Sequence, residues 1–290
     1  MAFRVVCIKN HCKLEYSLNY LIYKGEDTKK ILIDEIEMLI IESPQVCITS
    51  SLLSELVKKK VKIMFCDEKH RPLFEAVSYQ NNSLSYKKIK EQINRKENIK
   101  GEVWRLIIKA KLYYSALLLK KMNKFDEYKQ LISYVDMVEA DDLSSREGHG
   151  AKIYFHALFG KDFSRKDEDI KENKYLNFGY SIIASLISRE IKYFGYLTEL
   201  GIHHIGESNP FNLTYDFIEP LRAYVDSFVV LNKVQEDNFK KVFIKMVEDV
   251  VVYEGKKMFL DNAIHLYVQK LFHCLNNENF ENLRFIEYEF

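Results

Sequence analysis

The sequence predicts an α+β protein, with a small N-terminal domain resembling a β-sandwich and a larger all-helical domain after it. Short runs of β-branched and aromatic residues fill the first 80 residues, and such runs are typical of strands. From about Ser83 onward, apolar residues recur every three or four positions, which is the period of an amphipathic helix. We therefore expect a β-rich domain at 1–80, a polar linker at 81–100 and a helical domain at 101–290.

The predicted strands of the first domain begin with the segment "KLEYSLNY" at 13–20, in which leucines and tyrosines alternate with polar residues. Its apolar face would carry Leu14, Tyr16, Leu18 and Tyr20. Other strands are expected at 3–8, 29–33, 38–43, 45–49, 61–66 and 74–79. One helix is expected at 50–60, where serines suited to capping precede lysines that suit the negative end of a helix dipole.

The second domain is predicted to contain helices alone. Its clearest segment is "GEVWRLIIKAKLYYSALLLKKMNK" at 101–124, which has apolar residues at helical spacing over its whole length. Further helices are expected at 126–140, 150–160, 180–200, 221–234, 238–254 and 260–276.

The composition is that of an ordinary soluble protein, because 47% of the residues are hydrophobic and 29% are charged. No apolar run reaches the ~18 residues that a membrane span needs, and no signal peptide is visible. We expect a cytoplasmic protein with no membrane partner. The five cysteines form no C-x-x-C pair, so reduced thiols are expected.

A net charge of +1 hides a strongly basic segment. Between Lys87 and Lys124 there are twelve Lys or Arg residues and three acids. Such a surplus favours contact with a polyanion, although a solvated helix face remains the alternative. The candidate contacts are Lys87, Lys88, Arg95, Arg105, Lys109 and Lys111.

Glu147 is the first candidate site residue. It lies three positions after Ser144 in "LSSREGHGAKIYF", so the two residues match a capping box and Glu147 could simply bind free backbone N–H groups. The residues alone leave that interpretation open beside a role as a ligand.

Two adjacent histidines, His203 and His204, form the second candidate. We expect them at the end of the helix predicted at 180–200, where a cationic imidazole would suit the helix dipole. Neighbouring helical side chains point about 100° apart, so at most one of the pair is expected to bind an ion.

The third candidate is the acidic pair of "NLTYDFIEPLRAYVD". Asp216 and Glu219 lie three residues apart and hence on one helical face, with Asn212 or Thr214 available to cap that helix. Pro220 disfavours a regular helix at Glu219, which places a carboxylate at a kink. Two or three carboxylates and one imidazole suit Mg²⁺ or Mn²⁺ better than a structural zinc.

Four blocks together resemble the CRISPR-associated integrase family of spacer acquisition, the Cas1 family, in the form found with a Cas9 effector. They are "REGHGAKIYFHALFG", "YLNFGYSII", "LGIHH" and "FNLTYDFIEPLR", in this order. The sequence departs from the family pattern at packing positions. Gly150 stands where alanine is usual, and Leu221 and Ala223 stand where phenylalanine and proline are common.

The resemblance implies that Glu147, His204 and Glu219 are the catalytic metal ligands. Asp216 and Arg222 would lie beside the metal site, and Arg222 could stabilise negative charge in the transition state. For Arg222 an ion pair with Asp226 is the alternative. His203 is expected to be a bystander.

The implied activity is a metal-dependent DNA integrase and endonuclease that joins 3′-hydroxyl ends of a short DNA fragment to the CRISPR repeat by transesterification. The implied partners are double-stranded DNA, a second copy of the chain in a homodimer and the small Cas2 protein, with room for other adaptation proteins. The six candidate basic residues between Lys87 and Lys111 are then the expected DNA contacts. Trp104 could stack on splayed bases, and the alternative is that it packs in the core. Two alternatives stay open: a non-enzymatic DNA-binding scaffold and a stand-alone metal-dependent nuclease.

Overall fold

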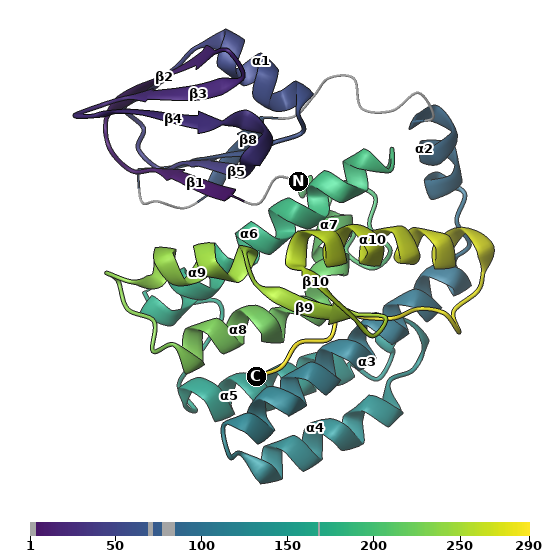
Figure 1. Cartoon of the computed structure of the whole chain (residues 1–290). Helices are drawn as coiled ribbons and strands as arrows, with labels where there is room; N and C mark the ends of the chain where they lie inside the picture. Colours follow the sequence, from purple (N-terminus) through teal and green to yellow (C-terminus); the bar gives the residue numbers. More distant parts are fainter. Residues whose placement is uncertain (1–3, 69–71, 77–84, 168) are drawn as a thin grey trace. The chain divides into compact units, whose positions relative to one another are not determined.

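The computed structural model describes residues 4–68, 72–76, 85–167 and 169–290. The chain forms two compact units, Met1–Asn81 and Asn82–Phe290 (Figure 1). The first is rich in strands and the second in helices, so the predicted α+β class is confirmed.

Two four-stranded sheets build the N-terminal unit. In the first sheet, three parallel strands are followed by one antiparallel strand. Their order is β1 (Arg4–Ile8), β5 (Ile36–Ile41), β7 (Lys62–Cys66) and β8 (Pro72–Ala76). The order in the second sheet is β4 (Thr28–Leu32), β3 (Tyr20–Lys24), β2 (Cys12–Ser17) and β6 (Val46–Ile48).

One hydrophobic core joins these sheets to the helix α1 (Ser50–Lys58). Leu14 and Leu21 come from one sheet, Leu39 from the other, and Leu52 from α1, and all four are fully buried. The Thr49 hydroxyl caps α1 by accepting a hydrogen bond from the Leu52 amide, so threonine takes the capping role expected of the serines. The last predicted strand, 74–79, is seen as far as Ala76, and 77–79 lie outside the described residues.

The prediction of one strand over 13–20 is wrong, because the chain reverses at Leu18 and Asn19. Both residues have positive φ angles of 47° and 66°, as the two central residues of a tight hairpin turn do. Leu18 is consequently 86% exposed instead of facing the core. Apolar and polar residues keep alternating through the turn, so the sequence pattern gives no sign of it.

Nine helices are described in the C-terminal unit, and two short 3₁₀ turns matter for the site. The helices are α2 (Ser85–Ile93), α3 (Glu97–Lys121), α4 (Phe125–Met137), α5 (Arg146–Phe159), α6 (Lys171–Tyr193), α7 (Asn212–Ile218), α8 (Arg222–Leu231), α9 (Phe239–Val247) and α10 (Leu260–Asn277). The 3₁₀ turns are Ala140–Asp142 and Glu219–Leu221. Helix α3 runs along α4 and also contacts α5, α7, α8 and α10 (Figure 1), so it forms the centre of this unit. None of the helices among the described residues is long and apolar enough to cross a membrane.

Two segments of the C-terminal unit differ from the sequence prediction. Residues 250–253, expected to continue a helix, form strand β9 (Val250–Tyr253), which pairs with β10 (Lys256–Phe259) in a hairpin. The valines at 250–252 favour a strand over a helix. The segment 81–100 was predicted as a linker, and its described part consists largely of α2 and the start of α3.

Gly179 of α6 lies where this helix packs on α8 and α9. A Cβ atom at this position would overlap with the side chains of Phe243 and Val225. Gly179→Ala is expected to lower the free energy of unfolding by about 1–3 kcal/mol, because the core must shift to accept the methyl group. Gly148→Ala is the matched control, since a Cβ there meets nothing within 4 Å and should stabilise its helix by ~0.5–1 kcal/mol. Chemical denaturation measures both, and equal effects would contradict this account of the packing.

Candidate active site

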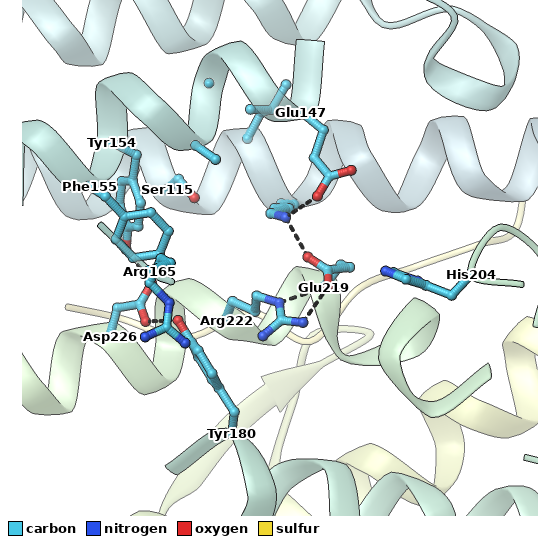
Figure 2. A pocket seen from close by; sticks show the side chains of 14 residues that line it. Ser115, Glu147, Tyr154, Phe155, Arg165, Tyr180, His204, Glu219, Arg222 and Asp226 are labelled. Carbon is cyan, nitrogen blue, oxygen red and sulfur yellow. Dashed lines mark hydrogen bonds and ion pairs between the residues drawn. The ribbon is translucent and has the colours of Figure 1, made fainter. Parts of the chain in front are cut away.

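A pocket of about 250 Å³ lies among α3, α5, α6, α8 and the loop before α7 (Figure 2). It brings together the three predicted ligands, Glu147, His204 and Glu219, from segments that are far apart in the sequence. Its lining also includes Lys111, Ser115, Tyr154, Arg165, Tyr180, Arg222 and Asp226.

Glu147 is presented by the first turn of α5. The cap of this helix is Asp142, whose carboxylate accepts hydrogen bonds from the amides of Arg146 and Glu147, each at 2.9 Å. The capping-box interpretation of Ser144 and Glu147 is therefore wrong, and the Glu147 side chain reaches across to Lys111 instead. Asp142 provides the cap because its two oxygens face the free N–H groups of the helix start.

Lys111 of α3 joins two of the predicted ligands. Its Nζ atom lies 2.6 Å from Glu147 Oε1 and 2.5 Å from Glu219 Oε2. These two carboxylate oxygens thus lie no farther apart than the sum of the two distances. Burial lowers the pKa of Lys111, but Glu219 and Glu147 raise it by more, so the ammonium keeps its charge.

Glu219 sits at the break that Pro220 imposes. Helix α7 ends at Ile218, a 3₁₀ turn spans Glu219–Leu221, and α8 starts at Arg222, so the regular α-helix is interrupted at Glu219. The backbone of Glu219 nevertheless keeps φ −50° and ψ −43°, within the α region that Pro220 was expected to disfavour. The side chain of Glu219 is 2% exposed, and its Oε1 accepts hydrogen bonds from Arg222 Nε at 2.8 Å and Nη2 at 2.7 Å. Burial raises the pKa of Glu219, but Arg222 and Lys111 outweigh it and hold that pKa at about 2.

Both histidines lie in a loop, not at a helix end, because α6 already ends at Tyr193. The loop is folded around the buried carboxylate of Asp216, which accepts hydrogen bonds from the amides of Ile202, His203 and His204 at 2.6, 3.2 and 3.0 Å. The same carboxylate contacts His204 Nδ1 at 2.6 Å. Asp216 therefore fixes the ring of His204, leaves its Nε2 for the pocket, and raises its pKa. Figure 2 shows this ring directed toward Glu219.

Neither predicted cap of α7 acts as one, because the position before the helix, Phe211, has no side-chain cap. The Asn212 amide instead donates to the carbonyls of Glu199 and Gly206 and closes the histidine loop.

His203 faces away from the pocket. Its ring stacks on Trp104 with centroids 4.1 Å apart and planes at 6°, and its Nδ1 lies 2.9 Å from Asp141 Oδ1. Trp104 is fully buried beneath it. The structure therefore supports the interpretation that Trp104 packs in the core.

Gly201 permits the close approach of the loop to Asp216. A Cβ atom there would overlap with the His204 carbonyl oxygen and press on Asp216 Oδ2. Gly201→Ala is expected to loosen the Asp216 hydrogen bonds, which lowers the melting temperature and moves the pKa of His204 back toward its ordinary value. Thermal unfolding and NMR titration of the His204 ring measure the two effects. Gly206→Ala, in the same loop but with wider clearances, should leave that pKa unchanged.

Asp226 forms a separate buried cluster at the other end of the pocket. It accepts hydrogen bonds from the hydroxyls of Tyr154, at 2.7 Å, and Tyr180. Burial raises the pKa of Asp226 to about 6, against the opposing effect of these bonds. Arg222 bonds to Glu219 and lies over the Tyr180 ring, so the ion pair of Arg222 with Asp226, the alternative considered from the sequence, is not the one that forms.

The six expected DNA contacts have different surroundings. Lys87 is well exposed, Lys88 pairs with Glu91, Arg105 pairs with Glu102, and Lys109 is half-buried. Arg95 is 9% exposed and lies over the rings of Tyr196 and Phe272, and Lys111 belongs to the pocket. The last two are therefore not the surface contacts that the prediction assumed.

The chemistry of the donors suits a divalent cation. Glu147 and Glu219 already enclose one positive charge, the Lys111 ammonium, and the imidazole of His204 faces the same pocket. In the part of the chain that the structure describes, no three His, Cys, Asp or Glu side chains are gathered closely enough to hold a metal ion. A metal ion would thus need Glu147, Glu219 and His204 to move closer together.

The chain thus has a β-rich unit followed by a helical unit, and the helical unit carries two carboxylates and an imidazole in one pocket. A family model described as "CRISPR associated protein Cas1" matches residues 6–263. The CRISPR-associated endonuclease Cas1 of Neisseria meningitidis is 32% identical over 231 residues, covering 79% of this chain and 76% of that protein. The chain belongs to the Cas1 family.

Solved structures agree with this fold. A casposase bound to its integration product matches with a TM-score of 0.77 at 19% identity, over 98% of this chain and 92% of that one. A Cas6-RT-Cas1–Cas2 complex matches with a TM-score of 0.74 at 16% identity, over 97% of this chain and 36% of that one.

Proposed function

We propose that the chain is a divalent-metal-dependent DNA integrase and endonuclease of CRISPR adaptation, which joins the 3′-hydroxyl ends of a short DNA fragment to the repeat. One observation carries the proposal. Glu147 and Glu219, from distant parts of the chain, share one cationic nitrogen in a pocket that His204 also lines. Family membership and the casposase-like fold support the assignment to DNA integration.

Glu147, Glu219 Oε2 and His204 Nε2 are the groups that would hold Mg²⁺ or Mn²⁺. When bound, such an ion polarises a phosphoryl oxygen and lowers the pKa of an attacking hydroxyl. Arg222 keeps Glu219 ionised and in place through two hydrogen bonds to its other oxygen. Asp216 orients His204 in the same way.

The proposed step is a transesterification. The 3′-hydroxyl oxygen of the fragment attacks a backbone phosphorus of the repeat and forms a new P–O bond. The bond from that phosphorus to the 3′-oxygen of the repeat strand breaks, and the leaving oxygen takes up a proton as the attacking hydroxyl loses one. Water in place of the hydroxyl gives the endonuclease reaction.

We also propose two protein partners. A Cas2 protein is one, supported by a structural neighbour that is a complex containing Cas1 and Cas2. A second copy of this chain in a homodimer is the other, and it rests on the family resemblance. For double-stranded DNA we propose phosphate contacts from Lys87 and Lys88, which line a second pocket of about 690 Å³ with Lys90 and Lys96.

The test is a joining assay with a labelled DNA fragment, a CRISPR-repeat plasmid and the Cas2 partner, in Mg²⁺, Mn²⁺ or a chelator. The proposal expects joining that requires the ion and is lost in His204→Ala. Joining that persists in the chelator would refute the metal-dependent mechanism and leave the scaffold alternative. Cleavage without joining, whether or not Cas2 is present, would indicate the stand-alone nuclease.

A further inference from the structure

We propose that the Lys111 ammonium is a placeholder cation, which holds Glu147 and Glu219 together in the metal-free protein and is exchanged for the divalent cation on loading. This inference rests on the proposed metal site, and it adds that Lys111 competes with the metal ion for the two carboxylates.

The position of the ammonium carries the inference. Its nitrogen lies within hydrogen-bond distance of both predicted ligand carboxylates at once, at 2.6 and 2.5 Å. The side chain is 13% exposed and arises from α3, whose neighbouring residues Ile107, Ile108 and Leu112 are buried. A lysine pointing inward from such a helix face is held there by the two carboxylates, since burying an unpaired ammonium is costly.

Charge balance makes the ammonium and the metal competitors. Two carboxylates are already neutralised by Lys111 and Arg222, so a divalent cation would add two uncompensated charges to a buried cluster. If the Lys111 ammonium leaves the cluster when the metal binds, the excess positive charge falls from two to one.

Lys111 is the cation that can leave. Arg222 makes two bonds to a single oxygen of Glu219 and lies 4.7 Å from the centroid of the Tyr180 ring. Lys111 binds one oxygen of each carboxylate at the end of a flexible four-carbon chain, and the pocket lies beside it. Its departure frees Glu147 Oε1 and Glu219 Oε2 together and leaves the Arg222 bonds intact.

The experiment compares the full-length protein with Lys111→Met and with Lys109→Met, which removes a lysine two residues away on the same helix. Mn²⁺ binding is titrated by the EPR signal of the free ion, and thermal unfolding is followed in EDTA and in Mn²⁺. Lys111→Met is expected to bind Mn²⁺ about tenfold more tightly or better, because no internal cation competes. In EDTA it should melt about 5 °C or more below the wild type, and Mn²⁺ should close most of that gap. Lys109→Met should match the wild type in Mn²⁺ affinity.

Equal or weaker Mn²⁺ binding by Lys111→Met would overturn the exchange. If Lys111→Met and the wild type had equal melting temperatures in EDTA, Lys111 would not be holding Glu147 and Glu219 together. If Lys111→Met does not fold in EDTA, Lys111→Gln, which retains a hydrogen-bond donor, is measured with the same expected order of affinities. Failure of the wild type to bind Mn²⁺ at all would count against the proposed metal site, whereas a wild type that binds Mn²⁺ and a variant that binds it no better would count against the placeholder alone.

Discussion

Glu219→Gln is expected to lower the rate of DNA joining by about a thousandfold. The amide keeps the shape of the side chain but loses the charge that would hold a divalent cation, at a position that a 3₁₀ turn and Arg222 fix in the pocket. The measurement is the joining assay in Mg²⁺ and in Mn²⁺, with circular dichroism to confirm that the variant is folded.

Glu102→Gln is the matched control for this loss. Glu102 lies on α3 and pairs with Arg105 at a half-exposed site, so its replacement should change the joining rate less than about twofold. A folded Glu219→Gln protein that joins DNA within tenfold of the wild-type rate would exclude Glu219 as a catalytic ligand.

Arg222→Met is expected to lower the free energy of unfolding by about 3–5 kcal/mol. The substitution leaves the buried carboxylate of Glu219 with Lys111 as its remaining cation, and it also removes the guanidinium from the Tyr180 ring. Chemical denaturation at neutral pH measures the loss.

A double-mutant cycle separates charge from packing in this pair. Arg222→Met combined with Glu219→Gln should recover part of the stability, because no unpaired buried charge remains. Arg105→Met, at the half-exposed pair, should cost less than about 1 kcal/mol. If Arg222→Met were no more harmful than Arg105→Met, the buried ion pair would not stabilise the fold.

Apolar patterning located the main elements of both units. Helices α3 and α10 and strands β1, β5 and β7 were found close to their expected positions. Strands β5 and β7 are buried at nearly every residue and α3 is buried on most of its sides, so their continuous apolar runs marked them. Patterning failed where a backbone reversal left the pattern undisturbed, as at Leu18 and Asn19. It failed again at 250–253, because no glycine or proline separates the end of α9 at Val247 from the valines that form β9.

The sequence predicted which residues form the site better than it predicted the contacts among them. The resemblance supplied Glu147, His204 and Glu219, and all three line one pocket. The roles of Asp142 and Lys111 were missed, because a cap and a buried cation depend on partners that lie far away in the sequence. For Lys111 there was a usable signal: it lies four residues after Ile107 and four before Ser115, on the buried face of its helix. A lysine on that face indicates a buried ion pair.

The stack of Trp104 on His203 gives this protein an optical reporter. Trp104 is the sole tryptophan of the chain, and the ring above it is the immediate neighbour of His204. Its emission should change in intensity whenever the His203 ring shifts, because that ring stacks directly on the indole. Rearrangement of the histidine loop on DNA or ion loading can therefore be timed by stopped flow without any attached dye.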